Sequence, residues 1–446
     1  MSADGWWALA YRLVIPFVAL CLYAALALLW QSGAHSFYFG ALHLVGVEPF
    51  SSPFLDIQAV LAAAECKRLG IDVYLSNPCD ALGRPHVYSP LWLAITPYFL
   101  DTQATRWVGM SLDLLFILSL LVLPRPRTCR DLLIVGSATF SPMTVYALER
   151  ANNDLLVFLL VLCACLVFLA PRPYRLCSYA LYTMAGLLKY YPLVLLVLLA
   201  RERRRDRAVA IGIIALILVF FGGYYYPELA KALTNIPHAS YFADSFSAEN
   251  LPFGFGDALG DGFSRTTIAV TLLGTLSVLA IARTRHTLRL LEREEFDPSE
   301  CEIQCLVVGS ILLTACFFAG QNINYRGIYF LLVVPGLLHL FRLAHESALR
   351  RFWTRMIAAV LFLMWDEFFR RALHTVVAPL PSEELRMRAD IFFWLGRELV
   401  WWWLVTGLVA ITLSCLWRAP SARVTSRLRI FNALLGDSVR TGKASP

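Results

Sequence analysis

The chain has 446 residues, of which 58% are hydrophobic and 16% are charged. A water-soluble domain of this length cannot cover so much apolar surface, so the composition excludes a soluble enzyme and indicates a membrane protein. The formal net charge is +7, but the basic residues gather in short segments beside apolar runs. That pattern is typical of cytoplasmic loops and argues against a nucleic-acid partner.

Apolar runs long enough to cross about 30 Å of hydrocarbon recur along the chain. We count roughly ten to twelve such runs. Examples are Leu13–Trp30, Ala208–Tyr226, Ile303–Ala319, Gly327–Phe341 and Phe392–Leu416. The first run lacks a following small-residue cleavage site, so we expect it to be a retained helix. The predicted fold is an all-α polytopic membrane protein with a single integral membrane domain over residues 1–446.

Four arginine clusters set the predicted orientation. They contain Arg201, Arg203, Arg204, Arg205 and Arg207; Arg283, Arg285, Arg289 and Arg293; Arg350, Arg351 and Arg355; and Arg418, Arg423, Arg427 and Arg429. The positive-inside rule places all four in the cytoplasm, with residues 418–446 as a basic cytoplasmic tail. Four loops then lie outside, namely residues 31–87, 227–265, 321–326 and 375–388. We therefore expect a multi-pass protein of the inner (plasma) membrane, with its site facing the periplasm.

The first outer loop, residues 31–87, is too long to be a simple connector, and loops of this length usually carry function. Within it, Phe54–Leu69 has apolar residues at helical spacing, which predicts an amphipathic helix on the outer membrane surface. Ser52 and Pro53 suit an N-cap and a first-turn proline. Asp56 would then lie in the first turn, where the helix dipole favours a carboxylate.

Two of the 11 cysteines, Cys66 and Cys79, fall in this outer loop. An oxidising compartment and a separation that a local bridge can close predict a disulfide between them. The alternative is two unpaired thiols. The other cysteines lie mostly in apolar spans or cytoplasmic loops, where a thiol behaves as a small hydrophobic group.

The apolar stretch Leu176–Ala200 conflicts with the charge rule if it is one span, because arginines flank both of its ends. A break at Lys189-Tyr190-Tyr191-Pro192 resolves the conflict, since proline disfavours helix in the preceding residue. Two half-helices would then meet near the outer surface, and Lys189 would face a polar cavity. A similar break is possible at Ser141-Pro142, and Tyr88–Pro124 can cross the membrane once or twice.

Ionisable residues at the edges of apolar spans are costly and usually functional. Four polar groups of this kind stand out: Asp56 with its neighbours, Glu149–Asp154, Lys189–Pro192 and Gln321–Arg326. All four can open to the outer face on the predicted topology. One carboxylate beside several cations can deprotonate a hydroxyl while the cations stabilise an anionic phosphate leaving group.

Five short runs carry a family resemblance. Phe54–Gln58, Gly70–Tyr74 and Tyr88–Trp92 resemble the opening motifs of the family-87 glycosyltransferases of the GT-C fold. Asn152–Leu156 and Lys189–Pro192 resemble the later motifs of that family. The resemblance covers Phe54 to Ala200, with weaker support from Asn324–Pro335. The sequence departs from the family pattern at Val73 and Ser89, where proline is usual, and at Glu149–Asn152. The resemblance implies a GT-C-type helix bundle that uses a polyprenyl-phosphate sugar, typically mannose.

The resemblance implies that Asp56 is the general base and that Lys189 binds the lipid phosphate. Charge and topology add Arg150 and Arg326 as further phosphate ligands. Tyr88, Asn152, Asp154, Tyr190 and Asn324 are expected to contact substrate. The competing interpretations are a helix-capping role for Asp56 and interfacial snorkelling for the two arginines.

The predicted function is a membrane hexosyltransferase with a polyprenyl-phosphate sugar as donor and a lipid or glycan as acceptor, embedded among membrane lipids. The chain has no Asp-x-Asp motif and no His or Cys cluster with metal-ligand spacing, so we expect no metal and no cofactor. The main alternative is a secondary transporter or flippase for an anionic or lipid-linked substrate. A structural subunit without activity is a third interpretation.

Overall fold

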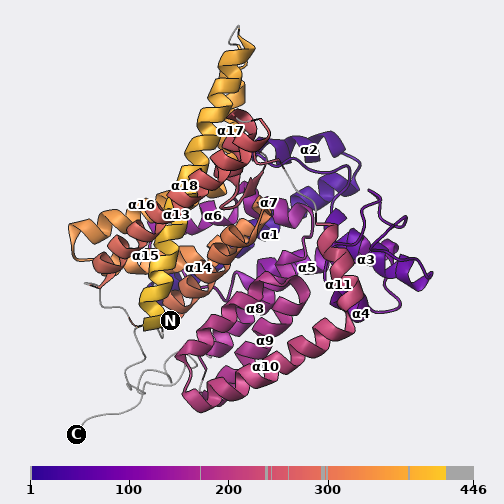
Figure 1. Ribbon diagram of the computed structural model, residues 1–446, viewed down its shortest axis with the longest axis horizontal. Coiled ribbons are helices and arrows are strands. Elements are labelled where there is room, and N and C mark those ends of the chain that lie inside the picture. Colours follow the sequence, from indigo (N-terminus) through magenta and orange to yellow (C-terminus); the bar gives the residue numbers. More distant parts are fainter. Residues whose placement is uncertain are drawn as a thin grey trace.

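The computed structural model describes residues 3–170, 172–236, 240–242, 244–259, 261–292, 297, 300–379 and 382–417. The expected basic tail at residues 418–446 and Arg293 lie outside the described residues. The described chain is a bundle of helices (Figure 1). The predicted all-α polytopic fold is confirmed.

The first half of the bundle ends at residue 201. It comprises α1 (Ala3–Gln31), α2 (His35–Leu44), α3 (Leu55–Arg68), α4 (Pro90–Ile95), η1 (Thr102–Ala104), α5 (Thr105–Ser119), α6 (Cys129–Thr139), α7 (Pro142–Glu149), α8 (Asp154–Phe168), α9 (Arg172–Lys189) and the 3₁₀ helix η2 (Tyr191–Arg201).

The second half contains the longest helices and a short strand pair. It comprises α10 (Arg204–Tyr224), α11 (Tyr226–Thr234), β1 (Ser245–Phe246), α12 (Asn250–Leu259), α13 (Phe263–Leu291), α14 (Cys301–Ala319), β2 (Asn322–Ile323), η3 (Asn324–Tyr329), α15 (Phe330–Leu343), α16 (Ser347–Met364), α17 (Asp366–Val377) and α18 (Glu383–Trp417). The strands β1 and β2 pair antiparallel, with Ser245 opposite Ile323.

Six helices within the described residues are long and apolar enough to cross a membrane, and a seventh span results if α6 and α7 are joined. The sequence predicted more, roughly ten to twelve. The difference arises because apolar runs such as those of α8 and η2 form helices too short to count as crossings by this measure.

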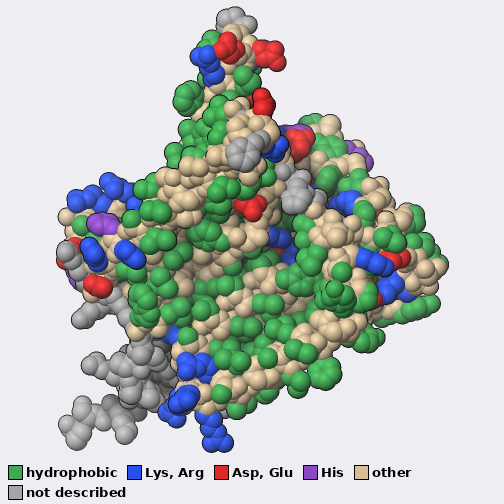
Figure 2. Space-filling view, in the orientation of Figure 1, with side chains coloured by type: hydrophobic (Ala, Val, Ile, Leu, Met, Phe, Trp, Pro, Cys, Tyr) green, Lys and Arg blue, Asp and Glu red, His purple; other side chains and the backbone are tan. Residues whose placement is uncertain are grey.

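Burial separates the central helices from the outer ones. Helices α14 and α15 are mostly buried, whereas α10 and α13 expose their apolar side chains. A helix that is apolar all round and exposed suits contact with lipid. Figure 2 shows hydrophobic side chains covering the face along α10.

The predicted break after Lys189 is confirmed. Helix α9 ends at Lys189, Tyr190 has a φ of 40°, and η2 begins at the next residue. The chain then runs back along α9, because the Tyr179 hydroxyl donates to the Leu198 carbonyl at 3.0 Å. Arg175 Nη1 lies 3.3 Å from Glu202 Oε1, so both ends of this hairpin lie on the same side of the bundle.

The second predicted break is also present. Helices α6 and α7 meet at an angle of 45°. Ser141 is the N-cap of α7, where its hydroxyl accepts a 3.4 Å hydrogen bond from the Thr144 amide, and Pro142 follows in the first turn. A capped start with proline at the first position fixes where the new helix begins.

Three of the four segments predicted to lie outside come together at one end of the bundle, and helix α17, which leads into the fourth, contacts the first of them. Lys231 forms an ion pair with Asp72 at 2.5 Å. Strands β1 and β2 join the second and third segments. At the edge of this end, Arg371 Nη2 of α17 lies 2.7 Å from Glu48 Oε2 of the first loop.

Helix α3 differs from its prediction in two respects. It is not an amphipathic surface helix, because eleven of its fourteen residues are buried. It is also not capped by Ser52 or Pro53, since the N-cap is Phe54 in the left-handed region with a φ of 68°. Many of its residues are small alanines, which allow the rest of the loop, α4, α5 and η1 to pack closely around it. Asp56 does lie in its first turn, as predicted.

Candidate active site

Asp56 lies at the centre of a buried polar group. Its Oδ2 accepts a 2.6 Å hydrogen bond from Asn152 Nδ2 and lies 3.3 Å from Arg150 Nε. Its Oδ1 lies 3.3 Å from Arg84 Nη1. The Asp56 side chain is only 5% exposed, so this carboxylate is compensated by two guanidinium groups and one amide.

Two backbone hydrogen bonds place Asp56 beside the end of α7. The Phe54 amide donates to the Glu149 carbonyl at 2.8 Å, and the Asp56 amide donates to the Arg150 carbonyl at 3.1 Å. The start of α3 therefore takes up two carbonyl groups that the C-terminus of α7 leaves without partners inside its own helix. This contact fixes the distance between two segments almost a hundred residues apart.

A second carboxylate, Asp154, forms ion pairs with two further cations. Its Oδ2 lies 2.8 Å from Lys189 Nζ and 3.4 Å from Arg326 Nε. The Tyr191 hydroxyl donates to Asp154 Oδ1 at 2.7 Å and also contacts the Tyr329 hydroxyl. Asp154 is fully buried, so these partners supply the compensation that a buried charge requires.

Asn152 joins the two groups. Its Nδ2 donates to Asp56, while its Oδ1 accepts from Lys189 Nζ at 3.2 Å and from the Asp154 amide at 2.9 Å. Four cations, Arg84, Arg150, Lys189 and Arg326, surround Asp56 and Asp154, and Arg84 is also paired with Asp80, which leaves a formal charge of +1. A site of this charge attracts an anion such as a phosphate group.

Aromatic rings form walls around the cations. Lys189 Nζ lies 5.6 Å from the ring centre of Tyr88 and 5.5 Å from that of Tyr325. The Arg150 guanidinium lies 4.1 Å from the Phe50 ring and 4.8 Å from the Tyr146 ring. Contacts of this kind hold a cation and leave its outer face available to a ligand.

The cations differ in how far they are open to a ligand. The side chains of Arg84 and Arg326 are 31% and 22% exposed, whereas those of Arg150 and Lys189 are each 7% exposed. Arg84 and Arg326 therefore form the accessible rim of the site. Arg150 and Lys189 form its base.

Backbone strain gathers at the same place. Within the described residues, Phe54, Ala151 and Tyr190 are the non-glycine residues with positive φ, at 68°, 41° and 40°. Each lies within two positions of Asp56, Arg150, Asn152 or Lys189. A conformation of this type costs about 1–3 kcal/mol and persists where surrounding contacts enforce it, commonly at functional sites.

The structure brings together most of the residues predicted from the sequence. Asp56, Arg150, Asn152, Asp154, Lys189 and Arg326 form one connected network, and Tyr88 lies beside it. Two predicted residues have other neighbours. Tyr190 forms the turn between α9 and η2, and its hydroxyl interacts with Ser89.

The second exception is Asn324, whose Nδ2 lies 3.4 Å from Asp366 Oδ2. Asp366 belongs to a separate ionic group, in which Arg397 Nη1 approaches it at 3.9 Å. Burial raises the pKa of Asp366 to about 7. Asn324 therefore contacts a neighbouring acidic cluster and none of the partners of Asp56.

The sequence analysis missed Arg84, Tyr191 and Tyr325. Both tyrosines lie inside the polar runs that it singled out, at positions 191 and 325, but only their neighbours were chosen. Arg84 left a weaker signal, since it is one cation in a long loop. Its placement follows from Asp80, whose carboxylate accepts from Arg84 Nε and Nη2, each at 3.0 Å.

The disulfide predicted between Cys66 and Cys79 is present in the structure. It ties α3 to the segment that carries Asp80 and Arg84. Further along this segment, His86 is 2% exposed and packs between the rings of Tyr74 and Tyr88. Burial lowers the pKa of His86 to about 4, so this imidazole is neutral near pH 7.

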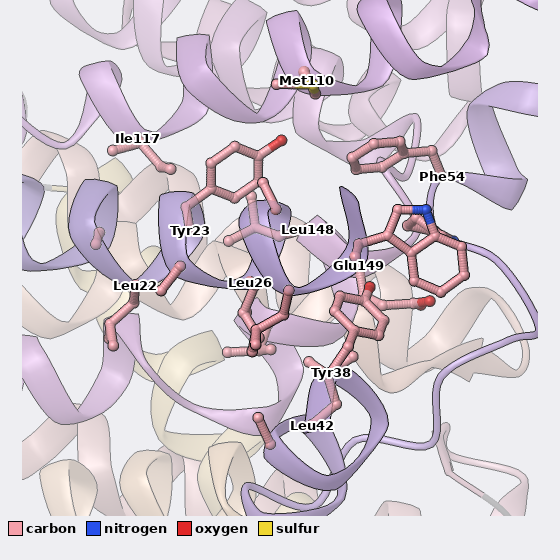
Figure 3. Close-up of a pocket in the computed structure, with 18 of the residues that line it drawn as sticks. Leu22, Tyr23, Leu26, Tyr38, Leu42, Phe54, Met110, Ile117, Leu148 and Glu149 are labelled. Carbon is pink, nitrogen blue, oxygen red and sulfur yellow. The ribbon is translucent and has the colours of Figure 1, made fainter. Parts of the chain in front are cut away.

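A large cavity of about 590 Å³ lies next to this network (Figure 3). Helices α1, α2, α5 and α7 line it, mainly with apolar side chains such as Leu22, Leu26 and Leu148. Phe54 and Glu149, which adjoin Asp56 and Arg150 in the chain, also line it. Its volume lies within the range of about 300–1,000 Å³ that ligand sites occupy.

Comparison with known proteins gives one match. Residues 86–299 match the family model of glycosyltransferase family 87. No curated protein matches the chain, and no solved structure does. The matched region includes Arg150, Asn152, Asp154 and Lys189 and ends before Arg326. This match supports the family predicted from the sequence, a family-87 glycosyltransferase of the membrane.

Proposed function

We propose that this protein transfers a hexose, mannose in the first instance, from a polyprenyl-phosphate donor to a lipid or glycan acceptor. The reaction would take place on the outer face of the inner (plasma) membrane. Asp56 would act as the general base, and Lys189, Arg150 and Arg326 would bind the lipid phosphate. Tyr88, Asn152 and Asp154 would line the substrate site.

The observation that carries this proposal is the bridge formed by Asn152. Its amide contacts the carboxylate of Asp56 on one side and the Lys189 ammonium on the other. The proposed base and one proposed phosphate ligand therefore lie one side chain apart. Because the site has an excess of positive charge, it favours a phosphate donor over a neutral one.

The proposed chemistry follows from these positions. The acceptor hydroxyl would give its proton to Asp56 Oδ1, the carboxylate oxygen that Asn152 does not contact. The acceptor oxygen would form a bond to the anomeric carbon as the bond from that carbon to the phosphate oxygen breaks. The phosphate leaves with the bonding electron pair, and the neighbouring cations stabilise its added negative charge.

Arg84 has a defined place in this scheme. It contacts Asp56 Oδ1, the oxygen assigned to the incoming proton, and it is the most exposed of the four cations. Its guanidinium would shift toward the donor phosphate when substrate enters and leave Oδ1 open to the acceptor. Arg84 would therefore serve as a fourth phosphate ligand.

The outward orientation rests on the arrangement of charge. Arg201 contacts Gln304 at the start of α14, and Arg342 forms an ion pair with Asp131 of α6. These contacts lie at the end of the bundle that carries the basic clusters, whereas Asp56 lies at the end formed by the first loop and its neighbours. The positive-inside rule assigns the basic end to the cytoplasm.

The direct test is transfer by the purified protein in lipid nanodiscs. Polyprenyl-phosphate mannose and polyprenyl-phosphate glucose would be offered with a membrane extract as acceptor, and GDP-mannose would serve as the comparison donor. We expect transfer from the polyprenyl donors alone. Transfer from the nucleotide sugar alone, or movement of the lipid-linked sugar across a liposome without transfer, would contradict the proposal.

A further inference from the structure

The apolar cavity beside α7 contains polar atoms that lack partners. Glu149 is 6% exposed and lines the cavity, and neither of its carboxylate oxygens has a hydrogen-bond partner among the described residues. The Phe50 amide interacts electrostatically with this carboxylate, but the two groups do not have the geometry of a hydrogen bond. The Tyr23 hydroxyl lies in the same lining and interacts with the Asp113 carboxyl group. Figure 3 shows both groups among the apolar side chains.

A buried carboxylate without hydrogen bonds is costly, so such a group calls for a ligand that donates to it. The remaining lining is overwhelmingly apolar. The ligand that satisfies both conditions is amphipathic, with a long apolar part and hydroxyl groups at one end. A lipid alcohol or a glycolipid has this chemistry.

The position of the cavity suits a ligand from the membrane. Leu22, Leu26 and Trp30 belong to the last part of the α1 span, next to the first loop. Leu22 and Leu44 line the cavity and are also 51% and 76% exposed, so the cavity opens at the lipid-facing surface. On the proposed topology, a lipid would enter from the outer leaflet.

Charge separates this cavity from the cationic site. Val145, Leu148 and Glu149 of α7 line the cavity, whereas Tyr146 and Arg150 contact each other on the side of the cationic site. The basic residue in the cavity lining is Arg106, which is exposed and lies at the start of α5. A phosphate would be drawn toward Lys189 and Arg326, whereas the α7 side chains in the cavity lining carry no positive charge.

We propose that this cavity binds the acceptor, and that the acceptor is an uncharged, hydroxyl-bearing lipid. The inference rests on the proposed function, which leaves the acceptor as a lipid or a glycan. The lipid chain would occupy the space between α1, α5 and α7, and a hydroxyl group would donate to Glu149. The headgroup would then extend toward Asp56. It would pass Phe54, whose backbone amide donates a hydrogen bond to the backbone carbonyl of Glu149.

The test measures binding in the full-length protein in nanodiscs, without relying on activity. The first probe is diacylglycerol with a diazirine in its acyl chain, and the second is polyprenyl phosphate with a diazirine in its chain. Labelled peptides are identified by mass spectrometry after illumination. We expect the diacylglycerol probe to label the lining of α1, α5 and α7, and excess unlabelled polyprenyl phosphate to leave that labelling unchanged.

Two variants and one analogue sharpen the result. Leu26→Trp fills the cavity and should lower labelling by about tenfold. Leu28→Trp is the matched control, because Leu28 lies on the same helix, is 65% exposed and is not part of the lining. The O-methyl ether of the probe cannot donate to Glu149 and should label about tenfold less well, a difference that Glu149→Leu should abolish.

Several outcomes would overturn the inference. The inference fails if the polyprenyl phosphate probe labels the cavity, or if the alcohol and its ether label it equally. It also fails if Leu28→Trp lowers the labelling as much as Leu26→Trp does. Each of them leaves sugar transfer by the protein intact, so the proposed function would stand. If the protein lacks transferase activity altogether, the proposed function fails first, and a labelled cavity would be a lipid site with no acceptor role.

Discussion

Asn152 holds Asp56 in place through a hydrogen bond of 2.6 Å from its Nδ2 to Oδ2. The same asparagine accepts from Lys189, so its amide cannot rotate without losing one of the two contacts. The orientation of Asp56 is therefore set in part by Lys189, the cation that pairs with Asp154. In its proposed role as general base, Asp56 would lose little freedom when the substrate arrives.

We predict that Asp56→Asn lowers transfer by at least about a hundredfold, because general-base catalysis of this type contributes about 10²–10⁴-fold. An asparagine fits the same space but cannot accept the proton. The turnover number should be measured with donor and acceptor both saturating. Unchanged thermal stability serves as the control for folding, and substantial residual transfer would move the base to another residue, with Asp154 the next to test.

We predict that Lys189→Met raises the KM for the donor and also destabilises the protein. Breaking a buried ion pair costs up to about 3–5 kcal/mol, and here the loss is partly offset because Arg326 still approaches Asp154. The double variant Lys189→Met/Asp154→Asn removes the charge of Asp154 as well. It should recover most of the stability while the donor KM stays high.

The matched control for this prediction is Lys231→Met. Lys231 also pairs with an aspartate of the outer segments, but both side chains are exposed. An exposed pair contributes little stability, so both donor KM and thermal stability should remain near those of the unmodified protein. If the double variant regains normal donor KM, Lys189 has a structural role only.

We predict that Ala151→Gly preserves or raises thermal stability, whereas Ala147→Gly lowers it. Both alanines are fully buried. Ala151 has a φ of 41°, which glycine adopts without strain, while Ala147 lies inside α7. Glycine in a helix interior costs about 1 kcal/mol relative to alanine. Differential scanning fluorimetry of the two variants decides the point, and equal losses would remove the argument for strain at the site.

We predict that the double variant Cys66→Ala/Cys79→Ser loses stability and donor affinity together. A disulfide that closes a loop of about 15 residues contributes about 3 kcal/mol. The bridge also anchors the segment in which Asp80 holds Arg84. Treating the unmodified protein with a reductant should reproduce the effect, and the variant itself should not respond. Donor kinetics unaffected by either change would separate the bridge from the active site.

We predict a loss of stability at acidic pH that depends on His86. The folded pKa of about 4 lies below the ordinary value of 6.5, so the unfolded chain binds the proton first. The neutral imidazole therefore contributes stability above about pH 6.5, and this contribution falls as the pH drops toward 4. The full change is on the order of 3 kcal/mol.

The measurement is chemical unfolding of the unmodified protein and of His86→Gln between pH 4 and pH 7. The variant should show a shallower loss of stability across this window. His345→Gln is the matched control, since His345 is exposed, and it should follow the unmodified protein. A variant with the same pH profile as the unmodified protein would contradict the prediction.

The sequence alone was sufficient to predict the parts of the fold that charge and proline determine. The reversal at Tyr190 followed from the arginines on both sides of Leu176–Ala200, and the structure has it. The surroundings of α3 could not be predicted in this way. Its apolar spacing suits a membrane surface equally well, and only tertiary packing, which periodicity does not record, decides that it is buried.

The candidate site shows the same division. Carboxylates and cations inside apolar surroundings are recognisable from sequence because they are costly, and this accounts for Asp154, Lys189 and Arg326. Arg84 lies in a polar loop, where a single arginine carries no such cost. Asn324 was grouped with Arg326 because the two are neighbours in the chain, but successive residues of η3 point in different directions, and Asn324 contacts Asp366.

The distribution of the network along the chain has a consequence for its biosynthesis. Asp56, Arg84, Asn152 and Lys189 all precede residue 202, where the α9–η2 hairpin ends, whereas Arg326 follows more than a hundred residues later. Since domains form from the N-terminus as the chain is made, Lys189 is the one cation in contact with Asp154 that is available until η3 has been synthesised. A ribosome that stalls before Arg326 would therefore leave a nascent chain with its proposed catalytic base already in position but its site one cation short.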